Sequence, residues 1–344
     1  MFFHVNVKNV AAVASTFAFA YFFIVIITSR TRFPDIHVQL NDIISYGILA
    51  IEQGGKAVCK ISEESDIGVR TKGKTFEGRN DLLTKADLIS NHLILETLSR
   101  IPGIKVISEE SRSSLTEQDV SRYRVDKYSL WLGIKDSISL LPSFTYPLSS
   151  LTIWVDPLDA TQEFTEQLYE YVTVMMCIAY EGQPVFGAIY QPFTDSLVLG
   201  LVDWGVMNSD GKKVTSSFQY NTSNTIVISR SHSGDVESLA RKAFGSEYKI
   251  KKAGGSGYKI LTLINHLSDI YLHRTRIKKW DTCAGDALVR AAGGAMIDLN
   301  ASPLDYGRDT DPVNRNGLFA SVDKPFTRFQ MLRSALSHSE TVVK

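Results

Sequence analysis

Apolar positions along this chain recur with a helical period in some stretches and gather into strand-like runs in others. Residues 38–59 predict a helix, because apolar side chains return every three to four positions, and residues 81–99 predict a second helix that ends before Pro102 and Gly103. Residues 171–202 form apolar runs broken by polar turns, which is typical of antiparallel strands and hairpins. The alternation of the two patterns predicts stacked α and β layers.

Three further stretches complete this outline. The polar residues 63–78 predict a loop, and the Ser- and charge-rich residues 111–150 predict a surface excursion. A smaller α/β part is predicted beyond it, with strands at residues 225–229 and 269–272. We therefore divide the chain into an N-terminal tail and anchor over 1–34, an α+β catalytic part over 35–220 and an α/β part over 221–344.

The N-terminal segment holds an uncharged apolar run over residues 10–28. As a helix it would be about 28 Å long, close to the hydrocarbon thickness of a bilayer, so we predict a transmembrane signal anchor. A cleaved signal peptide is the alternative, because Ala18-Phe19-Ala20 has the form of a cleavage site, although residues 21–27 stay apolar beyond it. Flanking charges leave the orientation open, and N-glycosylation sequons at Asn221 and Asn300 favour a lumenal body.

Composition narrows the classes of protein to consider. The 344 residues include 37 basic and 37 acidic ones, so the chain lacks the basic excess with which proteins bind polymeric DNA or RNA. Its three cysteines, Cys59, Cys177 and Cys283, are odd in number and far apart, and they indicate neither a disulfide framework nor a zinc site. Cys177 and Cys283 have apolar or small neighbours, so both are predicted to be thiols of the core.

The stretch 151–166, LTIWVDPLDATQEFTE, places two carboxylates, a hydroxyl and a helix start after an apolar strand. Pro157 is predicted to end the strand, since proline has no N–H for a sheet ladder, so Asp156 and Asp159 would lie in a turn. A helix starting at Thr161 would offer unpaired N–H groups to a phosphate. Carboxylates beside a phosphate require divalent cations between them, and oxygen ligands favour Mg²⁺. Read alone, the segment fits a structural turn and helix cap equally well.

Two other stretches supply carboxylates at comparable places. Glu109 and Glu110 directly follow a short strand-like run over residues 104–107. Trp280-Asp281 precedes a stripe of small apolar residues with helical spacing, and Asp281 would lie at the cap of that helix. Strand ends and helix starts are where α/β proteins gather their ligands. These carboxylates are therefore predicted to meet at one site.

In type and order, these acidic motifs resemble the signature of the Mg²⁺-dependent, lithium-sensitive phosphatases of the inositol monophosphatase superfamily. The resemblance begins near residue 36 and implies the five-layer αβαβα sandwich of those sugar-phosphatase folds. Residues 84–87, 229–233 and 254–259 are most similar to the phosphatases of 3′-phosphoadenosine 5′-phosphate, and closest to their Golgi-resident, membrane-anchored branch. Ala160 is typical of that branch, whereas most of the superfamily has glycine at this position.

The resemblance implies a metal-binding role for five residues. Asp156 would bridge two Mg²⁺ ions. Glu109 and the Leu158 carbonyl would complete one coordination shell, and Asp159 with Asp281 would complete the other. Two ions held in this way stabilise the attacking and the leaving oxygen together.

The resemblance also implies how the attacking water is handled. Asp87 and Thr161 would orient and deprotonate it, and a third Mg²⁺ would lie near Asp87 and Glu109. Glu110 is predicted to support the site from outside the coordination shell or to pair at the surface. Without the resemblance, Asp87 would be interpreted as an exposed carboxylate on a helix.

Six substrate-binding residues are implied as well, which are Ala160, Thr161, Ser229, His232, Gly255 and Lys259. Ser229 and His232 would contact the ribose or the 5′-phosphate, and Lys259 would pair with phosphate as a point charge. Taken singly, each also has an ordinary structural interpretation, such as a flexible glycine loop around Gly255 or a solvated lysine.

The sequence thus predicts a Mg²⁺-dependent 3′-nucleotidase with two or three ions, which converts 3′-phosphoadenosine 5′-phosphate to AMP and phosphate in the Golgi lumen and so supports sulfation. One alternative is an inositol phosphate phosphatase. The other is a catalytically silent membrane protein that binds a nucleotide. The expected partners are the nucleotide and the membrane, without any nucleic acid polymer, and the family resemblance is compatible with a homodimer.

Overall fold

The computed structural model describes residues 14–23, 35–75, 78–111, 114–214, 224–230 and 235–340. The chain forms two compact units, Met1–Ile36 and His37–Lys344. In the first unit residues 14–23 are helical and exposed, and the rest of the predicted anchor over 10–28 lies outside the described residues. Among the helices that the structure describes, none combines the length and the apolar character needed to cross a bilayer.

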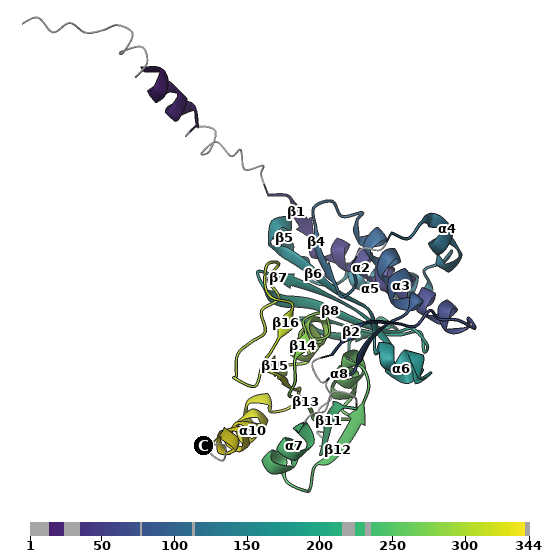
Figure 1. Ribbon diagram of the computed structural model, residues 1–344, viewed down its shortest axis with the longest axis vertical. Helices are drawn as coiled ribbons and strands as arrows, with labels where there is room; N and C mark the ends of the chain where they lie inside the picture. Colours follow the sequence, from purple (N-terminus) through teal and green to yellow (C-terminus); the bar gives the residue numbers. More distant parts are fainter. Residues whose placement is uncertain are drawn as a thin grey trace, which may run out of the picture. The chain divides into compact units, whose positions relative to one another are not determined.

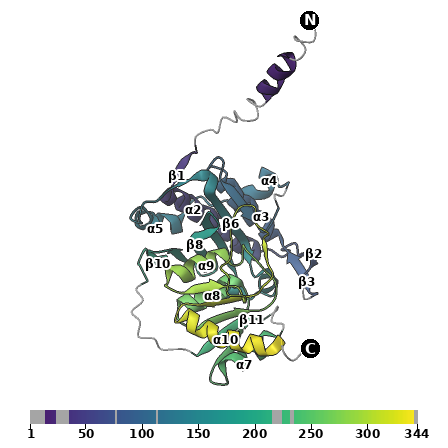
Figure 2. The same ribbon diagram turned by 90° about the vertical axis from the view of Figure 1, so that its left-hand side faces the viewer.

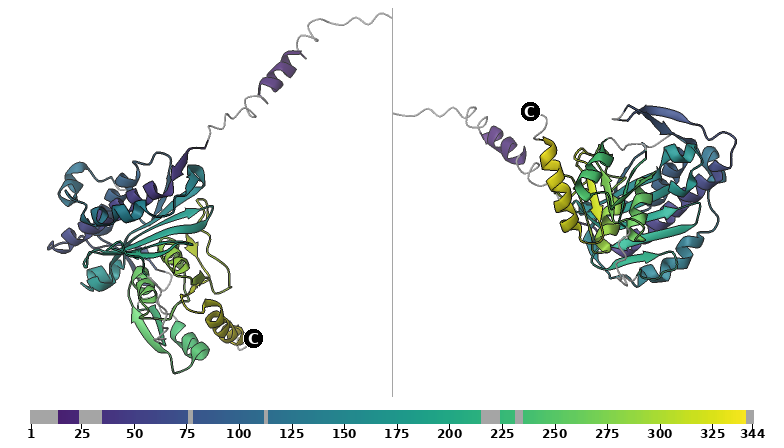
Figure 3. Two further views of the ribbon diagram at one scale, coloured as in Figure 1. Left: turned by 180° about the vertical axis from the view of Figure 1, so that it is seen from behind. Right: turned by 90° about the horizontal axis from the view of Figure 1, so that it is seen from below.

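The unit His37–Lys344 is built of five stacked layers in the order α, β, α, β, α (Figure 1 and Figure 3). The first layer consists of α2 (Leu40–Ser62), α3 (Lys85–Leu98) and α5 (Ser129–Ser139). The third layer consists of α8 (Ser256–Ile264) and α9 (Cys283–Ala291). The fifth layer consists of α7 (Val236–Phe244) and α10 (Pro325–Glu340). Figure 2 shows α8 and α9 between the two sheets, with α7 and α10 beyond the second one. This order agrees with the layered α/β fold that the sequence predicts.

The first sheet has six strands in the order β10-β9-β8-β7-β6-β4. They are β4 (Lys105–Ser108), β6 (Leu151–Asp159), β7 (Thr173–Tyr180), β8 (Gln183–Gln191), β9 (Ser196–Leu201) and β10 (Gly205–Asn208). Only the β4–β6 pair is parallel among them, and the other neighbouring pairs are antiparallel. The hairpins predicted over residues 171–202 are thereby confirmed.

The second sheet has five strands in the order β12-β11-β13-β17-β15. They are β11 (Thr225–Ser229), β12 (Lys249–Ala253), β13 (Ile270–His273), β15 (Ala295–Ile297) and β17 (Leu318–Ser321). Strands β12, β11 and β13 run parallel, and β17 is antiparallel to both of its neighbours. The strands predicted at residues 225–229 and 269–272 correspond to β11 and β13. The predicted boundary between residues 220 and 221 lies outside the described residues.

Three apolar cores separate these layers. One lies between the first helices and the first sheet, one between the two sheets around α8 and α9, and one between the second sheet and the outer helices. Helix α2 follows the predicted periodicity, since Ile44, Ile48 and Ile51 are fully buried on its inner side. Burial of these apolar stripes is the main force that holds the layers together.

The second predicted helix begins later than its sequence pattern suggests. Residues Asn80–Leu83 form β3, which pairs with β2 (Arg70–Lys74) in a hairpin, so part of the predicted loop over 63–78 is a strand. Helix α3 then starts at a capping box, because Thr84 Oγ1 accepts from the Asp87 N–H and the Asp87 carboxylate accepts from the Thr84 N–H. Hairpin pairing, which the sequence pattern did not indicate, sets this boundary.

The predicted excursion over residues 111–150 is more regular than expected. It contains α4 (Glu117–Val120), α5 and β5 (Thr145–Pro147), and β5 pairs with β1 (His37–Gln39). Ile134 and Ile138 of α5 are buried against the first layer, so part of this stretch belongs to the core. The remaining two-stranded sheet joins β14 (Ile277–Lys278) to β16 (Val313–Asn314).

Strand β6 does not end at Pro157 as predicted. It continues to Asp159, and its register against β7 shifts between Asp156 and Asp159. Such a bulge leaves the proline outside the ladder, where its missing N–H costs nothing, and Ser90 Oγ donates to the Pro157 carbonyl at 2.7 Å. Asp156 and Asp159 therefore belong to a buried strand instead of an open turn.

The interpretation of Cys177 and Cys283 as core thiols is wrong. The two cysteines form a disulfide between β7 and α9, across a separation of 106 residues, with their Cα atoms 5.6 Å apart. Both are buried, and they meet because α9 packs directly on the first sheet. A spacing of this size gives no sequence signal, since connectivity depends on which layers pack together. Cys59 is a free cysteine.

Candidate active site

Segments from both halves of the fold line one cavity of about 710 Å³. Its acidic wall includes Glu109, Asp159 and Asp281, which come from the end of β4, from β6 and from the turn before α9. The cavity also reaches residues of the β2–β3 hairpin and of β11, α8 and β14. The site therefore lies where the end of the first sheet meets the third layer.

Asp156 and Asp159 are held in place by β6, all of whose residues are buried. Asp156 is 1% exposed and is not among the residues that line the cavity, and its Oδ1 accepts from the Leu158 N–H at 3.1 Å. Asp159 accepts from Thr173 Oγ1 on the neighbouring strand at 2.9 Å. Of the two, Asp159 lines the cavity, and the register shift against β7 lies between them.

Asp159 also binds the start of α8. The backbone N–H groups of Ser256 and Gly257 donate to its two carboxylate oxygens at 3.0 and 2.8 Å. The positive end of α8 therefore faces a carboxylate of the first sheet. Ser256 Oγ in turn donates to the Asp281 carbonyl at 2.6 Å, so α8 joins the two acidic segments.

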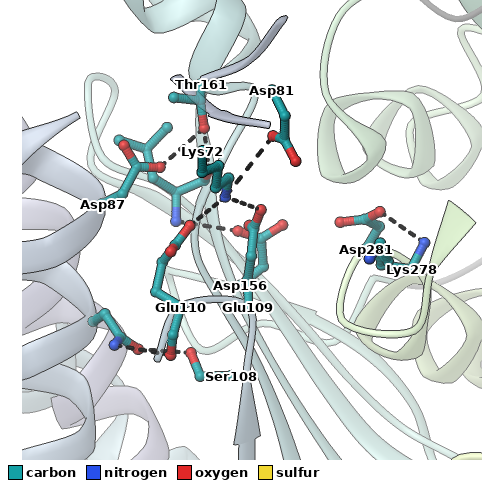
Figure 4. A network of polar contacts seen from close by, with 12 residues as sticks. Lys72, Asp81, Asp87, Ser108, Glu109, Glu110, Asp156, Thr161, Lys278 and Asp281 are labelled. Carbon is teal, nitrogen blue, oxygen red and sulfur yellow. Dashed lines mark hydrogen bonds and ion pairs between the residues drawn. The ribbon is translucent and has the colours of Figure 1, made fainter. Parts of the chain in front are cut away.

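Glu109 and Glu110 share a cationic partner on the β2–β3 hairpin. Lys72 Nζ lies 2.8 Å from Glu109 Oε1, makes a closer contact with Glu110 and lies 4.0 Å from Asp81 (Figure 4). Glu110 is 8% exposed and is not among the residues that line the cavity, so it is a buried partner of Lys72 and not a surface residue. The ammonium group of Lys72 supplies the positive charge that this part of the acidic wall requires.

Asp87 is fully buried and is not the exposed helix carboxylate that its sequence context suggests. Its Oδ2 accepts from the Thr84 hydroxyl at 2.6 Å, and its Oδ1 accepts from Thr161 Oγ1 at 2.9 Å (Figure 4). Thr161 is the first residue of α6 (Thr161–Thr165), as predicted, and it lines the cavity. The Asp87–Thr161 pair thus connects a buried carboxylate to the cavity through one hydroxyl.

Burial makes four of the carboxylates weaker acids, which are Glu109, Asp281, Asp87 and Asp156. Burial raises the pKa of Glu109 to about 8, with Lys72 acting against the shift and Asp281 adding to it. Burial likewise raises the pKa of Asp281 to about 7 and that of Asp87 to about 6, and it raises the pKa of Asp156 well above its usual range. The acidic wall is therefore short of positive charge.

The donor set fits hard divalent cations. It consists of carboxylate oxygens with the Leu158 carbonyl nearby, which are ligands that Mg²⁺ accepts. In the described part of the chain, however, no three His, Cys, Asp or Glu side chains are close enough together to hold an ion as they stand. In Figure 4, Lys72 lies on one side of the Asp156 and Glu109 carboxylates, and Asp281 lies on their other side. The residue types suit Mg²⁺, and the side chains would have to close around it.

The opposite wall carries most of the predicted substrate residues. Ser229 is at the end of β11, and Gly255 and Lys259 belong to the start of α8, and all three line the cavity together with Ala160. His232 lies outside the described residues. The structure thus brings these residues to the cavity that Glu109, Asp159 and Asp281 also line, and their role in substrate binding stays a prediction.

Gly255 is more than part of a flexible loop. Its φ is +56°, and a Cβ at this position would lie 2.6 Å from the Tyr171 carbonyl oxygen and 2.9 Å from Asp159 Oδ2. No other residue type fits such an approach without movement. Ala160, by contrast, adopts a left-handed conformation with φ of 74° in spite of its methyl group, and it caps α6.

Lys259 is buried instead of solvated. Its Nζ donates to the Gly255 carbonyl and lies 5.4 Å from the centre of the Tyr271 ring. Burial lowers the pKa of Lys259 to about 8, while Asp159 and Glu163 act in the opposite direction. A buried ammonium group of this kind can pair with an anion in the cavity.

Several residues that line the cavity were not identified from the sequence. They are Lys72, Glu163, Tyr271, His273, Arg276 and Lys278. Lys72 fell in a stretch interpreted as a loop, and the β13–β14 residues lay outside every motif. Asp281 also precedes the helix instead of capping it, since α9 begins at Cys283 with Thr282 as its cap. For Lys278, its position three residues before Asp281 is the sequence feature that indicates a place in the site.

Comparison with known proteins agrees with this geometry. Residues 42–324 match the inositol monophosphatase family. A putative inositol monophosphatase 3 of Drosophila pseudoobscura pseudoobscura is 37% identical over 293 residues, covering 83% of this chain and 79% of the relative. The Golgi-resident adenosine 3′,5′-bisphosphate 3′-phosphatase of Mus musculus is 36% identical over 292 residues, covering 83% of this chain and 78% of that protein.

Solved structures show the same fold at lower identity. The extragenic suppressor protein SuhB of Bartonella henselae has a TM-score of 0.61 at 19% identity, covering 86% of this chain and 98% of its own. CysQ of Bacteroides thetaiotaomicron, a bacterial member of the inositol monophosphatase family, has a TM-score of 0.59 at 20% identity, covering 82% and 98% respectively. Sequence and fold together show that this chain belongs to the inositol monophosphatase family.

Proposed function

We propose that this protein is a Mg²⁺-dependent phosphomonoesterase that removes the 3′-phosphate of 3′-phosphoadenosine 5′-phosphate. The observation that carries this proposal is a single cavity lined by an acidic wall and by a second wall that carries the buried Lys259. The first wall suits the ester that is cleaved, and the second suits another anionic group of the same substrate. Relatives named as Golgi-resident adenosine 3′,5′-bisphosphate 3′-phosphatases add support.

Glu109, Asp156, the Leu158 carbonyl, Asp159 and Asp281 would hold two or three Mg²⁺ ions, whose charge would stabilise the developing oxyanions and acidify a bound water. The chain itself would orient that water. Thr161 Oγ1 donates its proton to Asp87, so its lone pairs are left to accept a hydrogen bond from water in the cavity. Asp87, with a pKa of about 6, would receive the proton through Thr161 as the water oxygen attacks phosphorus.

The substrate would be held by the second wall. Lys259 would pair with the 5′-phosphate, and Ser229 at the end of β11 would contact the ribose or that phosphate. The strained approach at Gly255 leaves backbone close to the cavity without a side chain in between. Cleavage of the bond between phosphorus and the 3′-oxygen then releases AMP and phosphate.

We further propose that the catalytic body lies in the Golgi lumen and is joined to the membrane by the segment over residues 10–28. The Cys177–Cys283 disulfide supports this location, because such bonds persist in oxidising compartments. In that compartment the enzyme would clear the by-product of sulfotransferases and so support sulfation. Asn300 is one sequon on this body, and Asn221 lies outside the described residues.

A second candidate is an inositol phosphate phosphatase, which the names of several relatives favour. Phosphate release should be measured with the full-length protein in detergent on 3′-phosphoadenosine 5′-phosphate and inositol 1-phosphate. We expect faster release from the nucleotide, dependence on Mg²⁺ and inhibition by Li⁺. Preference for the inositol ester would reject the nucleotidase proposal. No release from either would favour the silent nucleotide-binding protein, although none of the predicted carboxylates is missing.

A further inference from the structure

A buried carboxylate outside the predicted catalytic set joins the two walls of the cavity. Glu163 belongs to α6, the short helix that carries Thr161, and it is 3% exposed. Its Oε1 lies 3.3 Å from Nη1 of Arg230, the residue that follows β11. The same Nη1 lies 2.6 Å from Oε2 of Glu166, which is much more exposed. One guanidinium therefore holds two carboxylates of different burial.

Glu163 also lies against the backbone of Gly254. A Cβ on that glycine would lie 2.5 Å from both Cγ and Cδ of Glu163. Only the absence of a side chain at Gly254 allows the carboxylate to cover this peptide. The Arg230 N–H donates to the carbonyl of Ala253 at 3.1 Å. Arg230 and Gly254 therefore directly follow the paired ends of the neighbouring strands β11 and β12.

This arrangement adjoins the cavity wall that carries Ser229, Gly255 and Lys259, here called the substrate wall. Ser229 precedes Arg230 and Gly255 follows Gly254, and both Ser229 and Gly255 line the cavity. Arg230 itself does not line it and pairs with Glu163 of α6 and with Glu166, which directly follows α6. The sequence motif around Arg230 was expected to hold phosphate, but this guanidinium is engaged elsewhere. Removing Arg230 would leave the buried Glu163 carboxylate without this partner, whereas removing Glu163 would leave the partly exposed Arg230 paired with Glu166 alone.

We infer that the Glu163–Arg230 pair is a positioning device. It fixes the distance between the acidic wall with Thr161, here called the hydrolytic wall, and the substrate wall, and so selects substrates with two phosphates. The inference rests on the proposed function for its choice of substrate. A bisphosphate has to reach Thr161 and Lys259 at the same time, so its binding is sensitive to the separation of the walls. Binding of a monophosphate that reaches only the hydrolytic wall does not depend on this separation.

The decisive experiment compares Glu163→Gln with Glu166→Gln in the full-length protein. Both variants remove a charge that pairs with Arg230, but only Glu163 covers Gly254. For Glu163→Gln we expect KM for 3′-phosphoadenosine 5′-phosphate to rise about ten-fold with little change in kcat, and KM for adenosine 3′-monophosphate to stay unchanged. Glu166→Gln should resemble the wild type for both substrates.

Arg230 offers a second test of the same pair. Arg230→Met should raise KM as Glu163→Gln does, and the double variant should be no worse than either single one, because both remove one interaction. Arg230→Lys should restore part of the loss. Equal decreases in kcat for both nucleotides, or additive single effects, would overturn the inference.

Hydrogen exchange tests the positioning role independently of which substrate the enzyme prefers. The amides of Ser256 and Gly257 donate to Asp159 in the adjoining turn, so peptides that cover them should exchange faster in Glu163→Gln than in Glu166→Gln. Unchanged exchange in both variants would overturn the positioning role. If the wild type prefers inositol 1-phosphate, the proposed function fails, and the exchange result still decides whether the pair positions the segment.

Discussion

The two sheets of this protein contribute to the cavity in different ways. The first sheet supplies carboxylates directly from its strands, as with Glu109 after β4 and Asp156 in β6. The second sheet supplies Ser229 at a strand end, and its neighbouring helix α8 supplies Lys259. Most of the acidic wall therefore comes from strands of the first sheet and their ends, with Asp281 added from the turn before α9, whereas the substrate wall combines the end of β11 with the start of α8. This difference indicates that the two walls can be disturbed separately.

Asp159 is where the two walls meet. It lies in β6, but its partners are the N–H groups at the start of α8 and the Thr173 hydroxyl of β7. The free N–H groups of a helix start would otherwise bind an anionic ligand. In this protein they bind a carboxylate of the opposite wall, which holds α8 and its lysine in register with the acidic strand.

The largest expected effect comes from Asp156→Asn, which changes the most buried of the carboxylates proposed to hold Mg²⁺. Turnover should fall by more than about a hundred-fold, which is the upper range for removing a residue that only supports a metal ligand. Phosphate release measures it, with Asp126→Asn on an exposed loop as the matched control. A variant that keeps wild-type turnover would contradict the assignment of this wall.

Breaking the covalent link between β7 and α9 should lower stability without altering either wall directly. The double variant Cys177→Ser with Cys283→Ser is expected to lose about 2–4 kcal/mol in the free energy of unfolding. Denaturation curves measure this loss, and Cys59→Ser serves as the control because Cys59 is free. Without reductant, the denatured protein should show one reactive thiol, and three reactive thiols would disprove the disulfide.

Lys259→Met tests the substrate wall alone. Loss of a charge-assisted contact to phosphate typically costs about 1.5–3 kcal/mol, so KM for the bisphosphate should rise while kcat changes little. The methyl thioether keeps the buried volume beside Tyr271. Equal loss with adenosine 3′-monophosphate, which lacks the second phosphate, would show that Lys259 acts in the hydrolytic wall instead.

The acidic wall should also set the pH dependence of the metal-free protein. Glu109 and Asp281 have pKa values of about 8 and 7 when folded, well above their ordinary values of 4.5 and 3.8. The folded chain then binds more protons than the unfolded chain between about pH 4 and 8, so the free energy of unfolding falls as pH rises through this window. Thermal unfolding in EDTA measures it. Saturating Mg²⁺ should remove or reverse the slope, because it binds the ionised carboxylates.

The smallest expected effect concerns the strained residue between the walls. Ala160→Gly should stabilise the protein by roughly 0.5–1 kcal/mol, because glycine adopts the left-handed conformation without a Cβ penalty. A melting temperature higher by about 2 °C or less would be the sign of this effect. A lower one would show that the Ala160 methyl group contributes packing that outweighs its strain.

Local sequence determined much of the fold and of the acidic wall. Periodicity identified α2, the hairpins of the first sheet and the strands β11 and β13, because side-chain alternation follows from burial of one face. The motif in β6 and the start of α6 were likewise visible, since carboxylates, proline and a helix cap lie within a few residues of each other. Even there, the course of β6 through Pro157 required knowledge of its partner β7.

Contacts between distant layers were decided by tertiary structure alone. The Cys177–Cys283 bond, the pairing of Lys72 with Glu109 and the contact of Glu163 with Arg230 join residues that are 106, 37 and 67 positions apart. No local pattern encodes such pairs, because each depends on which elements pack together and at what register. The sequence by itself determined which chemical groups are present at the acidic motif, and packing of the two sheets around α8 and α9 decided what faces them.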